Sequence, residues 1–363
     1  MKIAYLLHLN EASADSGVYK KVLSQIKYWS MYGNEVRVFQ ITEKNLLIEN
    51  EYAIWRAFKY SSLSNYDRLI KAWYLVADEV ANWSPDVVYL RFDIFSPAFI
   101  KIAKKIPIVV EVNTDDFKEY CLKHDFRCFY NLLTRKFLFE NASGIAFVSK
   151  EISEKSYFKI FNKPYAVIGN GIDLSLYSST PPPNNVGFNL VFIGSEGYAW
   201  HGADKIVKLA QIKSEWQFHL IGTKKDFGLP NVKAYGTLSR EQYEPIMVRS
   251  DVAIGSLALH RIGINEISTL KVREYLAYGL PVIVGYKDTD FPDKVPFILE
   301  LPNCENNVVE YIVEIESFLN YWKGKRVLRN EILHINWRVK EMERLRFLRE
   351  IIENKTFECR RIG

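Results

Sequence analysis

The sequence has few cysteines and no long apolar run. Only four of its 363 residues are cysteines, and no two of them form a Cys-x-x-Cys pair. Cysteines this sparse exclude a disulfide scaffold, so we expect reduced thiols and a cytoplasmic protein. No run of about 18 apolar residues occurs, so no membrane-spanning helix is predicted. The apolar start of the chain stops at His8 without a small-residue cleavage site, which predicts a buried strand rather than a signal peptide.

Several functional motifs are also missing. The six histidines do not join the cysteines at metal-ligand spacing and no His-Glu-x-x-His occurs, so no metal site is predicted. No strongly basic block is interleaved with aromatic residues, so we predict no nucleic-acid partner. The net charge of +5 is a mild bias that fits an anionic substrate or an anionic membrane surface. No Gly-x-Gly-x-x-Gly follows the first predicted strand, which argues against a dinucleotide oxidoreductase.

Buried strands alternate with helical segments along the chain. In the first half, strands are predicted at residues 3–7, 35–41, 86–91, 108–112 and 144–149, and helices at 18–32 and 150–158. In the second half, strands are predicted at residues 189–193, 217–221, 232–235, 252–255 and 281–285. This alternation predicts an α/β fold of two Rossmann-like domains with parallel sheets that face each other across a cleft. Ligands of such sheets bind outside the carboxyl ends of the strands.

A proline-rich stretch separates the two halves. Proline disfavours both helix and central strand, so residues 180–185 are interpreted as a connector. We place an N-terminal domain at residues 1–168 and a C-terminal domain at 169–336. Residues 337–363 begin with apolar positions recurring at three and four, which predicts a final helix that packs back toward the N-terminal domain.

The most informative stretch is residues 265–283. Ser268 or Thr269 can cap a short helix, and Gly279 suits the position just after its end. Free N–H groups at the start of a helix attract phosphate. Lys271 falls in the first turn, where a cation opposes the helix dipole, and this placement indicates a bound anion. The alternative is a surface pair between Lys271 and Glu274.

Two glutamates with seven residues between them, followed by a Gly-x-Pro-Val-Ile turn and strand, resemble the acidic signature of retaining GT-B glycosyltransferases of family 4. The resemblance implies that Glu266 contacts the donor sugar and that Glu274 binds the ribose hydroxyls, which a carboxylate can accept in pairs. Thr269 and Leu270, at the start of the helix, join the predicted donor site.

Further short motifs occur in the family's order over nearly the whole chain. Residues 16–17 resemble the glycine-rich loop before the first helix, and residues 167–173 resemble the segment that enters the C-terminal domain. Residues 190–194 resemble the first strand of that domain with the diphosphate loop, and residues 234–238 resemble the loop that reads the base. One departure in the second motif is Gly169 in place of proline. The donor-binding positions that these motifs imply are Gly17, Gly194, Tyr235, Gly236 and Thr237.

The diphosphate loop departs from the family pattern. Many members have an arginine and a lysine there, whereas this chain has Ser195 and His201, in a segment that resembles a divergent Trp-His-Gly branch. Two phosphates still need cationic or N–H partners. The candidates are Lys271, Arg261, His201 and the helix N-terminus, although Arg261 is equally compatible with an ordinary surface position.

The acceptor side is less distinctive. The strand at residues 108–112 is followed by Asp115 and Asp116, and Asp115 is our candidate for catalysis on the acceptor side. The two aspartates can bind acceptor hydroxyls or cap the next helix. A paired-aspartate metal motif belongs to the other major glycosyltransferase fold, and GT-B enzymes generally need no metal. Arg91 and Asp93, after another strand, are either cleft residues or a strand-end ion pair.

Basic and aromatic residues are mixed at residues 50–74. Such a mixture can seat a helix on a bilayer surface, but core packing with solvated lysines explains it as well. If the acceptor is lipid-linked, this segment is the first predicted membrane contact.

The resemblance therefore implies a retaining, metal-independent hexosyltransferase. Its donor is a nucleotide sugar such as a UDP- or GDP-sugar, with no separate cofactor, and its acceptor is a saccharide or lipid-linked saccharide in polysaccharide or glycolipid assembly at the inner face of the membrane. The implied mechanism is front-side attack, in which the leaving diphosphate helps to take the acceptor proton. The alternatives are a nucleotide-sugar epimerase of the same fold and a non-catalytic nucleotide-sugar-binding protein.

Overall fold

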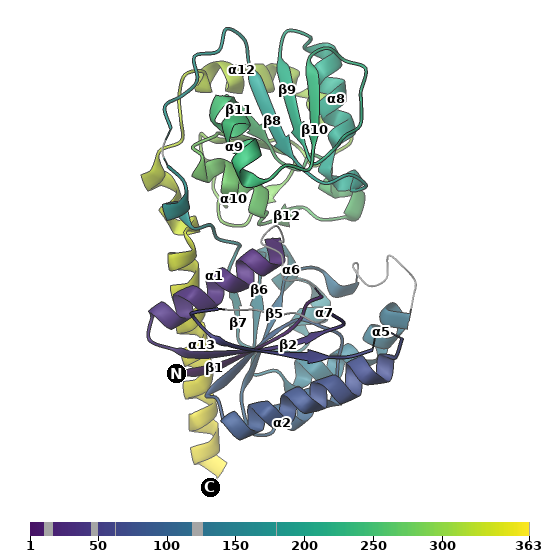
Figure 1. Cartoon of the computed structure of the whole chain (residues 1–363), viewed down its shortest axis with the longest axis vertical. Helices are drawn as coiled ribbons and strands as arrows, with labels where there is room; N and C mark the ends of the chain where they lie inside the picture. Colours follow the sequence, from purple (N-terminus) through teal and green to yellow (C-terminus); the bar gives the residue numbers. More distant parts are fainter. Residues whose placement is uncertain (11–16, 45–49, 62, 118–125, 179, 363) are drawn as a thin grey trace. The chain divides into compact units, whose positions relative to one another are not determined.

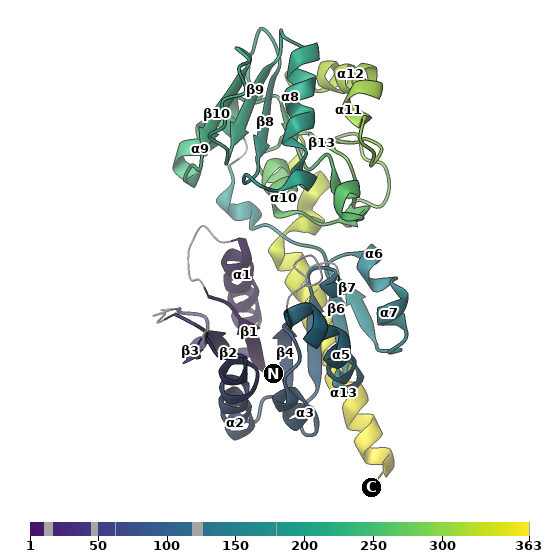
Figure 2. The ribbon, with the colours of Figure 1, turned by 90° about the vertical axis from the view of Figure 1, so that its right-hand side faces the viewer.

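A computed structural model describes the chain except for residues 11–16, 45–49, 62, 118–125, 179 and 363. The chain divides into two compact α/β units (Figures 1 and 2). Unit 1 comprises Met1–Gly169 together with Trp337–Gly363, and unit 2 comprises Asn170–Asn336. Among the described residues, no helix is both long enough and apolar enough to span a bilayer.

Unit 1 is built on a seven-stranded sheet in the order β3-β2-β1-β4-β5-β6-β7, in which all neighbouring strands are parallel. Its strands are β1 (Lys2–His8), β2 (Glu35–Thr42), β3 (Ile54–Lys59), β4 (Val87–Arg91), β5 (Ile108–Val112), β6 (Gly144–Phe147) and β7 (Tyr165–Val167). The central strands are buried except at Arg91, the half-buried last residue of β4, as expected for a parallel sheet covered on both faces.

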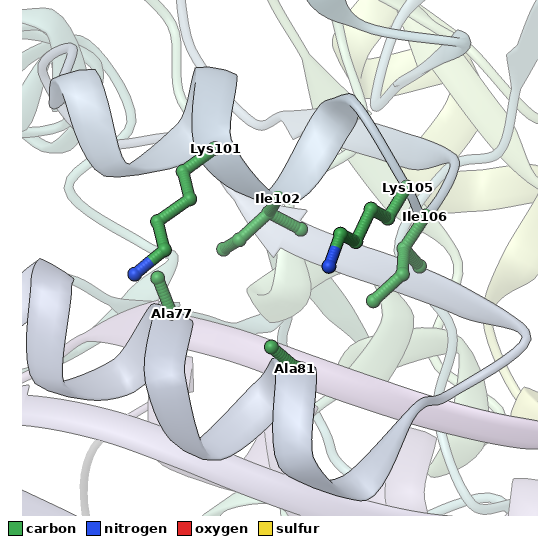
Figure 3. Close-up of a pocket in the computed structure, with 6 residues that line it drawn as sticks. All are labelled: Ala77, Ala81, Lys101, Ile102, Lys105 and Ile106. Atoms are coloured by element: carbon green, nitrogen blue, oxygen red, sulfur yellow. The ribbon is translucent and has the colours of Figure 1, made fainter.

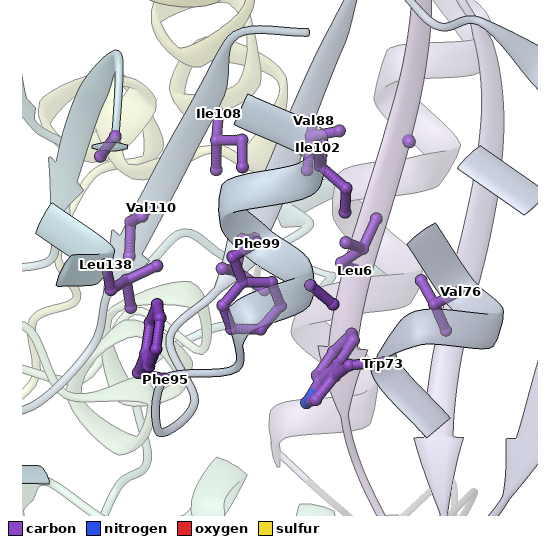
Figure 4. Packing of buried hydrophobic residues seen from close by; sticks show 14 of the residues in the cluster. Leu6, Trp73, Val76, Val88, Phe95, Phe99, Ile102, Ile108, Val110 and Leu138 are labelled. Atoms are coloured by element: carbon purple, nitrogen blue, oxygen red, sulfur yellow. The ribbon is translucent and has the colours of Figure 1, made fainter. Parts of the chain in front are cut away.

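Helices cover both faces of this sheet. Trp73, Phe99 and Phe139 from three helices pack with Leu6 and Val110 of the sheet on one face, part of which is shown in Figure 4. These helices are α2 (Trp73–Trp83), which continues the π-helix η1 (Asp67–Ala72), α3 (Pro97–Ala103) and α5 (Phe126–Asn141). The opposite face packs against α1 (Gly17–Met31) and α13 (Trp337–Ile362). Two short helices, α6 (Lys150–Ser153) and α7 (Ser156–Lys159), precede β7.

Buried polar contacts hold α13 to unit 1. Trp29 Nε1 donates to Glu341 at 2.7 Å, and Arg344 donates to the Tyr89 hydroxyl at 2.7 Å. Arg344 also pairs with Glu341 at 3.0 Å. Hydrogen bonds to the remaining atoms lower the desolvation cost of a buried ion pair, and these contacts supply part of them. The last helix of the chain is thus part of unit 1.

Unit 2 repeats the architecture with a six-stranded sheet in the order β10-β9-β8-β11-β13-β15, again with parallel neighbours. Its strands are β8 (Asn189–Ile193), β9 (Gln217–Ile221), β10 (Val232–Gly236), β11 (Val252–Ile254), β13 (Val282–Val284) and β15 (Ile298–Glu300), and a separate pair is β12 (Glu266–Ile267) with β14 (Lys287–Asp288). Its helices are η2 (Leu174–Leu176), η3 (Ala199–His201), α8 (Ala203–Ile212), α9 (Arg240–Arg249), η4 (Leu259–Ile262), α10 (Leu270–Ala277), α11 (Asn307–Glu310), α12 (Ile312–Trp322) and η5 (Arg329–Ile335).

The predicted α/β fold with parallel sheets is confirmed, with two local corrections. The helix predicted at residues 150–158 is two short helices, because Lys155 between them adopts an extended backbone. Cys128 is disulfide-bonded, which corrects the expectation of reduced thiols at that position, whereas Cys304 is free.

Each sheet has a point at which the strand order reverses. In unit 1 it lies between β1 and β4, and in unit 2 between β8 and β11. Ligands of doubly wound sheets bind in the crevice at the carboxyl ends of the strands beside this point. The loops after β8 and β11, and after β1 and β4, are therefore the places to look for binding residues.

Candidate functional site

The loop after β8 contacts the loop after β11 at the reversal point of unit 2. Leu257 donates its backbone N–H to the His201 carbonyl at 3.1 Å, and Ala258 donates to the Trp200 carbonyl at 3.2 Å. These bonds place the turn η3 beside the carboxyl end of the sheet. The segment predicted to bind the diphosphate therefore lies at the edge where ligands of such sheets bind.

Gly194 opens this loop, and its lack of a side chain is required. A Cβ atom there would overlap the Phe192 ring and lie 2.9 Å from His201 Nδ1. Any larger residue would displace one of these two rings. The next residue, Ser195, is exposed.

Lys271 is the second residue of α10, and its ammonium group is buried. Nζ lies 4.8 Å from the centre of the Phe192 ring, and it has no hydrogen-bond partner in the part of the chain that the structure describes. Burial lowers the pKa of Lys271 to about 7. The charged form of Lys271 pays a desolvation cost in this setting, and an anionic ligand would offset it. The alternative of an exposed pair with Glu274 does not fit a buried ammonium group.

His201 and Lys271 both lie beside the Phe192 ring. The centres of the His201 and Phe192 rings are 5.9 Å apart. The pKa of His201 is lowered to about 4, first by burial and then by the charge of Lys271, against a smaller upward effect of the Ser195 backbone. His201 is therefore neutral at pH 7, and an imidazole in this state offers an N–H donor rather than a second cation.

The start of α10 lacks the side-chain cap that the sequence predicts. Thr269 occupies the N-cap position without a capping hydrogen bond, and its hydroxyl lies 2.8 Å from the Tyr286 hydroxyl instead. Ser268 accepts from Arg273 at 2.7 Å and from the Asn170 backbone at 2.7 Å. The Thr269 side chain therefore does not bind the first-turn N–H groups, which include that of Leu270. An anion at the helix N-terminus can accept hydrogen bonds from these groups.

The end of α10 follows the prediction. Gly279 has a φ of +77°, and the Leu280 N–H donates to the Tyr275 carbonyl at 2.9 Å. This is the bond that closes a helix with glycine in the left-handed conformation, so the predicted role of Gly279 is confirmed.

Glu274 is held by two tyrosines. One oxygen, Oε1, accepts from the Tyr243 hydroxyl at 2.6 Å and from the Tyr177 hydroxyl at 3.2 Å. Both hydroxyls bind the same carboxylate oxygen, which fixes the side chain, while Oε2 accepts no hydrogen bond from the described residues. Glu266, in β12, accepts from the Thr289 hydroxyl at 3.0 Å. The sequence contains no pattern that singles out the two tyrosines.

Arg261 is already neutralised by the protein. Its guanidinium donates to Asp204 at 2.8 Å, forms a short contact with Glu305 and donates to the Ala199 carbonyl at 2.9 Å. These carboxylates raise its pKa above the ordinary value, although the group is partly exposed. Lys271, which has no hydrogen-bond partner among the described residues, is therefore a better candidate than Arg261 for binding the diphosphate.

The residues predicted to read the base lie at the end of β10 and just after it. Tyr235 is half-buried at the end of β10, and its hydroxyl lies 2.8 Å from His219 Nδ1. Gly236 is buried beside Lys224, and Thr237 is exposed. Gly17 is the first residue of α1, whereas Ser16 lies outside the described residues.

On the acceptor side, both aspartates are buried and bonded. Asp115 accepts from the Tyr157 hydroxyl at 2.6 Å. Asp116 accepts from Arg135 Nε at 2.8 Å and from Asn131 at 2.8 Å, so it serves a buried ion pair. These contacts leave Asp116 little capacity for an acceptor hydroxyl.

A row of titratable side chains lines the reversal point of unit 1, and the sequence singled out only one of its members. His8 Nε2 lies 2.6 Å from the Tyr60 hydroxyl, which donates to Glu43 at 3.0 Å. His8 Nδ1 lies 3.7 Å from Asp93, which accepts from Arg68 at 2.5 Å. The row takes residues from the ends of β1, β2, β3 and β4, and Arg68 lies in a π-helix, a distortion frequent at functional sites. The alternative of a strand-end ion pair at Asp93 is realised, but with Arg68 rather than Arg91.

Two hollows of unit 1, both partly open to solvent, are lined by none of these residues. A cavity of about 40 Å³ lies between α2 and α3 and is lined by Ala77, Ala81, Lys101, Ile102, Lys105 and Ile106 (Figure 3). A second, of about 280 Å³, is lined by β6, α7 and β7 residues. The first is far too small for a nucleotide sugar, because ligand pockets measure about 300–1,000 Å³.

No family profile and no curated protein matches the chain. Solved structures do. The lipopolysaccharide outer core galactosyltransferase WaaB in its apo form is similar over 98% of this chain and 100% of its own, at 15% identity and a TM-score of 0.69. Sucrose-phosphate synthase from Thermosynechococcus elongatus is similar over 99% and 98%, at 14% identity and a TM-score of 0.65.

A third similar structure is Anabaena Alr3699/HepE in complex with UDP and glucose, over 96% of this chain and 100% of its own, at 14% identity and a TM-score of 0.65. These similarities extend over nearly the full length of each chain. Together with the two parallel sheets they show that the chain has the GT-B fold of glycosyltransferases.

Proposed function

We propose that the protein is a glycosyltransferase whose nucleotide-sugar donor binds to unit 2. The observation that carries the proposal is Lys271, a buried ammonium group without a protein partner among the described residues, at the start of α10. A diphosphate would supply the missing negative charge and meet the N–H groups of the helix N-terminus as well. The HepE complex with UDP and glucose supports this choice of ligand class.

The remaining donor contacts of the proposal take the roles that the family resemblance implies. Glu274, fixed by Tyr243 and Tyr177, binds the ribose hydroxyls through Oε2. Glu266 contacts the donor sugar, neutral His201 donates a hydrogen bond to the diphosphate, and the backbone at Tyr235, Gly236 and Thr237 reads the base. Gly17, Ser195, Thr269 and Leu270 complete the set, whereas Arg261 contributes only indirectly because Asp204 and Glu305 hold it.

Transfer proceeds with retention at the anomeric carbon, as in family 4, and without a metal ion. The acceptor hydroxyl attacks on the face that the diphosphate leaves, and the diphosphate helps to take the proton. The protein contributes orientation and stabilisation of the charge that develops on the leaving group. The acceptor is a saccharide or lipid-linked saccharide, and the reaction serves polysaccharide or glycolipid assembly at the cytoplasmic face of the membrane.

Unit 1, which comprises residues 1–169 and the segment 337–363, binds the acceptor. Asp115 stays a candidate there, but the row formed by His8, Tyr60 and Asp93 suits hydroxyl groups better, because it lies at the strand ends beside the reversal point. His8 is partly accessible, with 18% of its side chain exposed, whereas Asp115 is buried.

A thermal-shift screen of UDP- and GDP-sugars, with donor hydrolysis as a second readout, tests the proposal. We expect at least one donor to raise the melting temperature and to be hydrolysed slowly without an acceptor. Stabilisation without hydrolysis or transfer to any saccharide would favour a non-catalytic binding protein. Conversion of the bound sugar into its epimer would favour an epimerase, and no stabilisation by any nucleotide sugar would overturn the proposal.

A further inference from the structure

Helix α5 of unit 1 presents large apolar side chains to solvent. The exposed fractions are 64% for Phe129, 56% for Leu133, 49% for Leu132, 47% for Phe126 and 38% for Phe137. A helix that packs on a sheet normally carries polar residues on its outer side. Single exposed apolar residues are ordinary, but five on one 16-residue helix are not.

These side chains form a stripe rather than a scatter. Phe126, Phe129, Leu133 and Phe137 follow one another at three and four residues, which places them along one side of the helix, with Leu132 adjacent. The opposite side of α5 is buried in unit 1 through Cys128, Asn131, Arg135, Leu138 and Phe139. The helix is thus apolar on its outer side in addition to its packed side.

Cations accompany the stripe. Arg127 and Lys136 are exposed on the same helix, and Lys136 Nζ lies 5.0 Å from the Phe137 ring. Helix α3 packs against α5, but Lys101 of α3 and Lys105 just after it line the hollow between α2 and α3 (Figure 3), and Lys101 pairs with Asp78 at 2.5 Å, so these lysines are not counted with the stripe. Of the 48 basic residues of the chain, 31 belong to unit 1, against 24 of the 43 acidic residues. The positive charge of the protein is therefore carried by the unit that bears the stripe.

We propose that the outer side of α5 docks onto an anionic lipid bilayer, with the stripe in the headgroup boundary and the cations against the lipid phosphates. A helix with an apolar stripe flanked by basic residues lies in the plane of such an interface. This assignment rests on the proposed function in one respect, because it names the surface that would hold the protein at the membrane face. The binding itself depends only on the exposed side chains of α5 and requires neither a sugar donor nor an acceptor.

A second copy of the chain fits this surface less well. The common twofold dimer brings the same surface patch of each subunit together. Two copies of unit 1, each with 31 basic against 24 acidic residues, would then come together, and like net charges across an interface are unfavourable. An anionic bilayer neutralises the same cations.

The docking surface proposed on α5 is not the segment at residues 50–74, which the sequence suggested as a membrane contact. There, Trp73, Tyr60 and Arg68 are buried in unit 1, so core packing accounts for these members of the segment.

Vesicle co-sedimentation of the full chain tests the assignment. We expect binding to vesicles of phosphatidylcholine mixed with phosphatidylglycerol, weaker binding at high salt, and little binding to phosphatidylcholine alone. The double variant Phe129→Ser/Leu133→Ser should lower the partition coefficient about tenfold or more, because half-exposed apolar groups of this size contribute to insertion. The matched control Val313→Ser/Leu328→Ser removes two apolar groups of similar exposure from unit 2 and should bind like the wild type.

Two further measurements make each outcome decisive. Thermal melting checks that both double variants are folded, and light scattering without vesicles gives the mass in solution. Equal binding by the two double variants, or no wild-type binding to the anionic vesicles, would overturn the assignment. A wild-type dimer that becomes a monomer in Phe129→Ser/Leu133→Ser would assign the stripe to a second copy instead. A nucleotide-sugar screen on the same samples reports the proposed function independently, so the two proposals can fail separately.

Discussion

Replacing Lys271 by methionine removes a buried charge and keeps most of the side-chain volume. In the folded protein the ammonium group has no hydrogen-bond partner among the described residues and lies 4.8 Å from the Phe192 ring centre. If the lysine serves a ligand, the ligand-free protein bears its desolvation cost, and removing it should stabilise the fold. We therefore expect Lys271→Met to unfold at a higher temperature than the wild type while losing donor affinity.

The magnitude follows from the pKa of Lys271, which burial lowers from 10.5 to about 7. Each pH unit corresponds to about 1.4 kcal/mol, so the charge costs at most about 5 kcal/mol near pH 6. Between pH 7 and 10.5 the unfolded chain holds more protons than the folded one, so stability rises with pH and the cost falls to about 1 kcal/mol near pH 10. Because methionine forfeits the cation–π contact with Phe192, we expect a net gain of about 2–3 kcal/mol near pH 6 and almost none near pH 10.

Urea denaturation at several pH values measures this difference. Lys287→Met, which removes an exposed lysine from the same unit, should change the unfolding free energy by about 0.5 kcal/mol or less at every pH. If Lys271→Met destabilises the protein, or if its effect on the unfolding free energy does not vary between pH 6 and pH 10, other groups of the protein offset the charge of Lys271. The reasoning would then fail.

Other substitutions test the neighbouring contacts. Glu274→Ala should reduce nucleotide-sugar affinity by about 1.5–3 kcal/mol, measured by calorimetry, because a charged hydrogen-bond acceptor is lost; unchanged affinity would remove the ribose assignment. Gly194→Ala should destabilise unit 2 by about 1–3 kcal/mol in thermal unfolding, because its Cβ would overlap the Phe192 ring. Gly187→Ala is its control, since a Cβ there meets only the Glu215 carbonyl at 3.3 Å, and equal effects of the two would show that the packing around Gly194 is loose.

Local patterns in the sequence predicted the fold because each pattern corresponds to one element. The apolar run at residues 108–112 coincides with β5, and the glycine after α10 occupies the predicted left-handed position. The strands β3, β7 and β15 were missed because they lie at sheet edges, where exposed residues interrupt the apolar pattern.

The surroundings of the site residues could not be predicted, because they come from segments distant in the sequence. Tyr177 reaches Glu274 across 97 positions, and the partners of Arg261 lie 57 and 44 positions away. No local pattern distinguishes Lys271 buried against Phe192 from Lys271 in a surface pair. The row at His8 needs the ends of four strands to lie side by side, which only the order of the sheet specifies.

The most direct test of the account is the number of protons taken up when a nucleotide sugar binds near pH 8. Calorimetry in buffers of different ionisation enthalpy gives this number, and the diphosphate of a nucleotide sugar has no proton of its own to exchange near that pH. Because free Lys271 is mostly neutral there and a bound diphosphate would charge it, we predict an uptake of roughly one proton per donor. Lys271→Arg, which is always charged, should bind without uptake. Binding by the wild type with no proton uptake, or the same uptake in Lys271→Arg, would contradict the account.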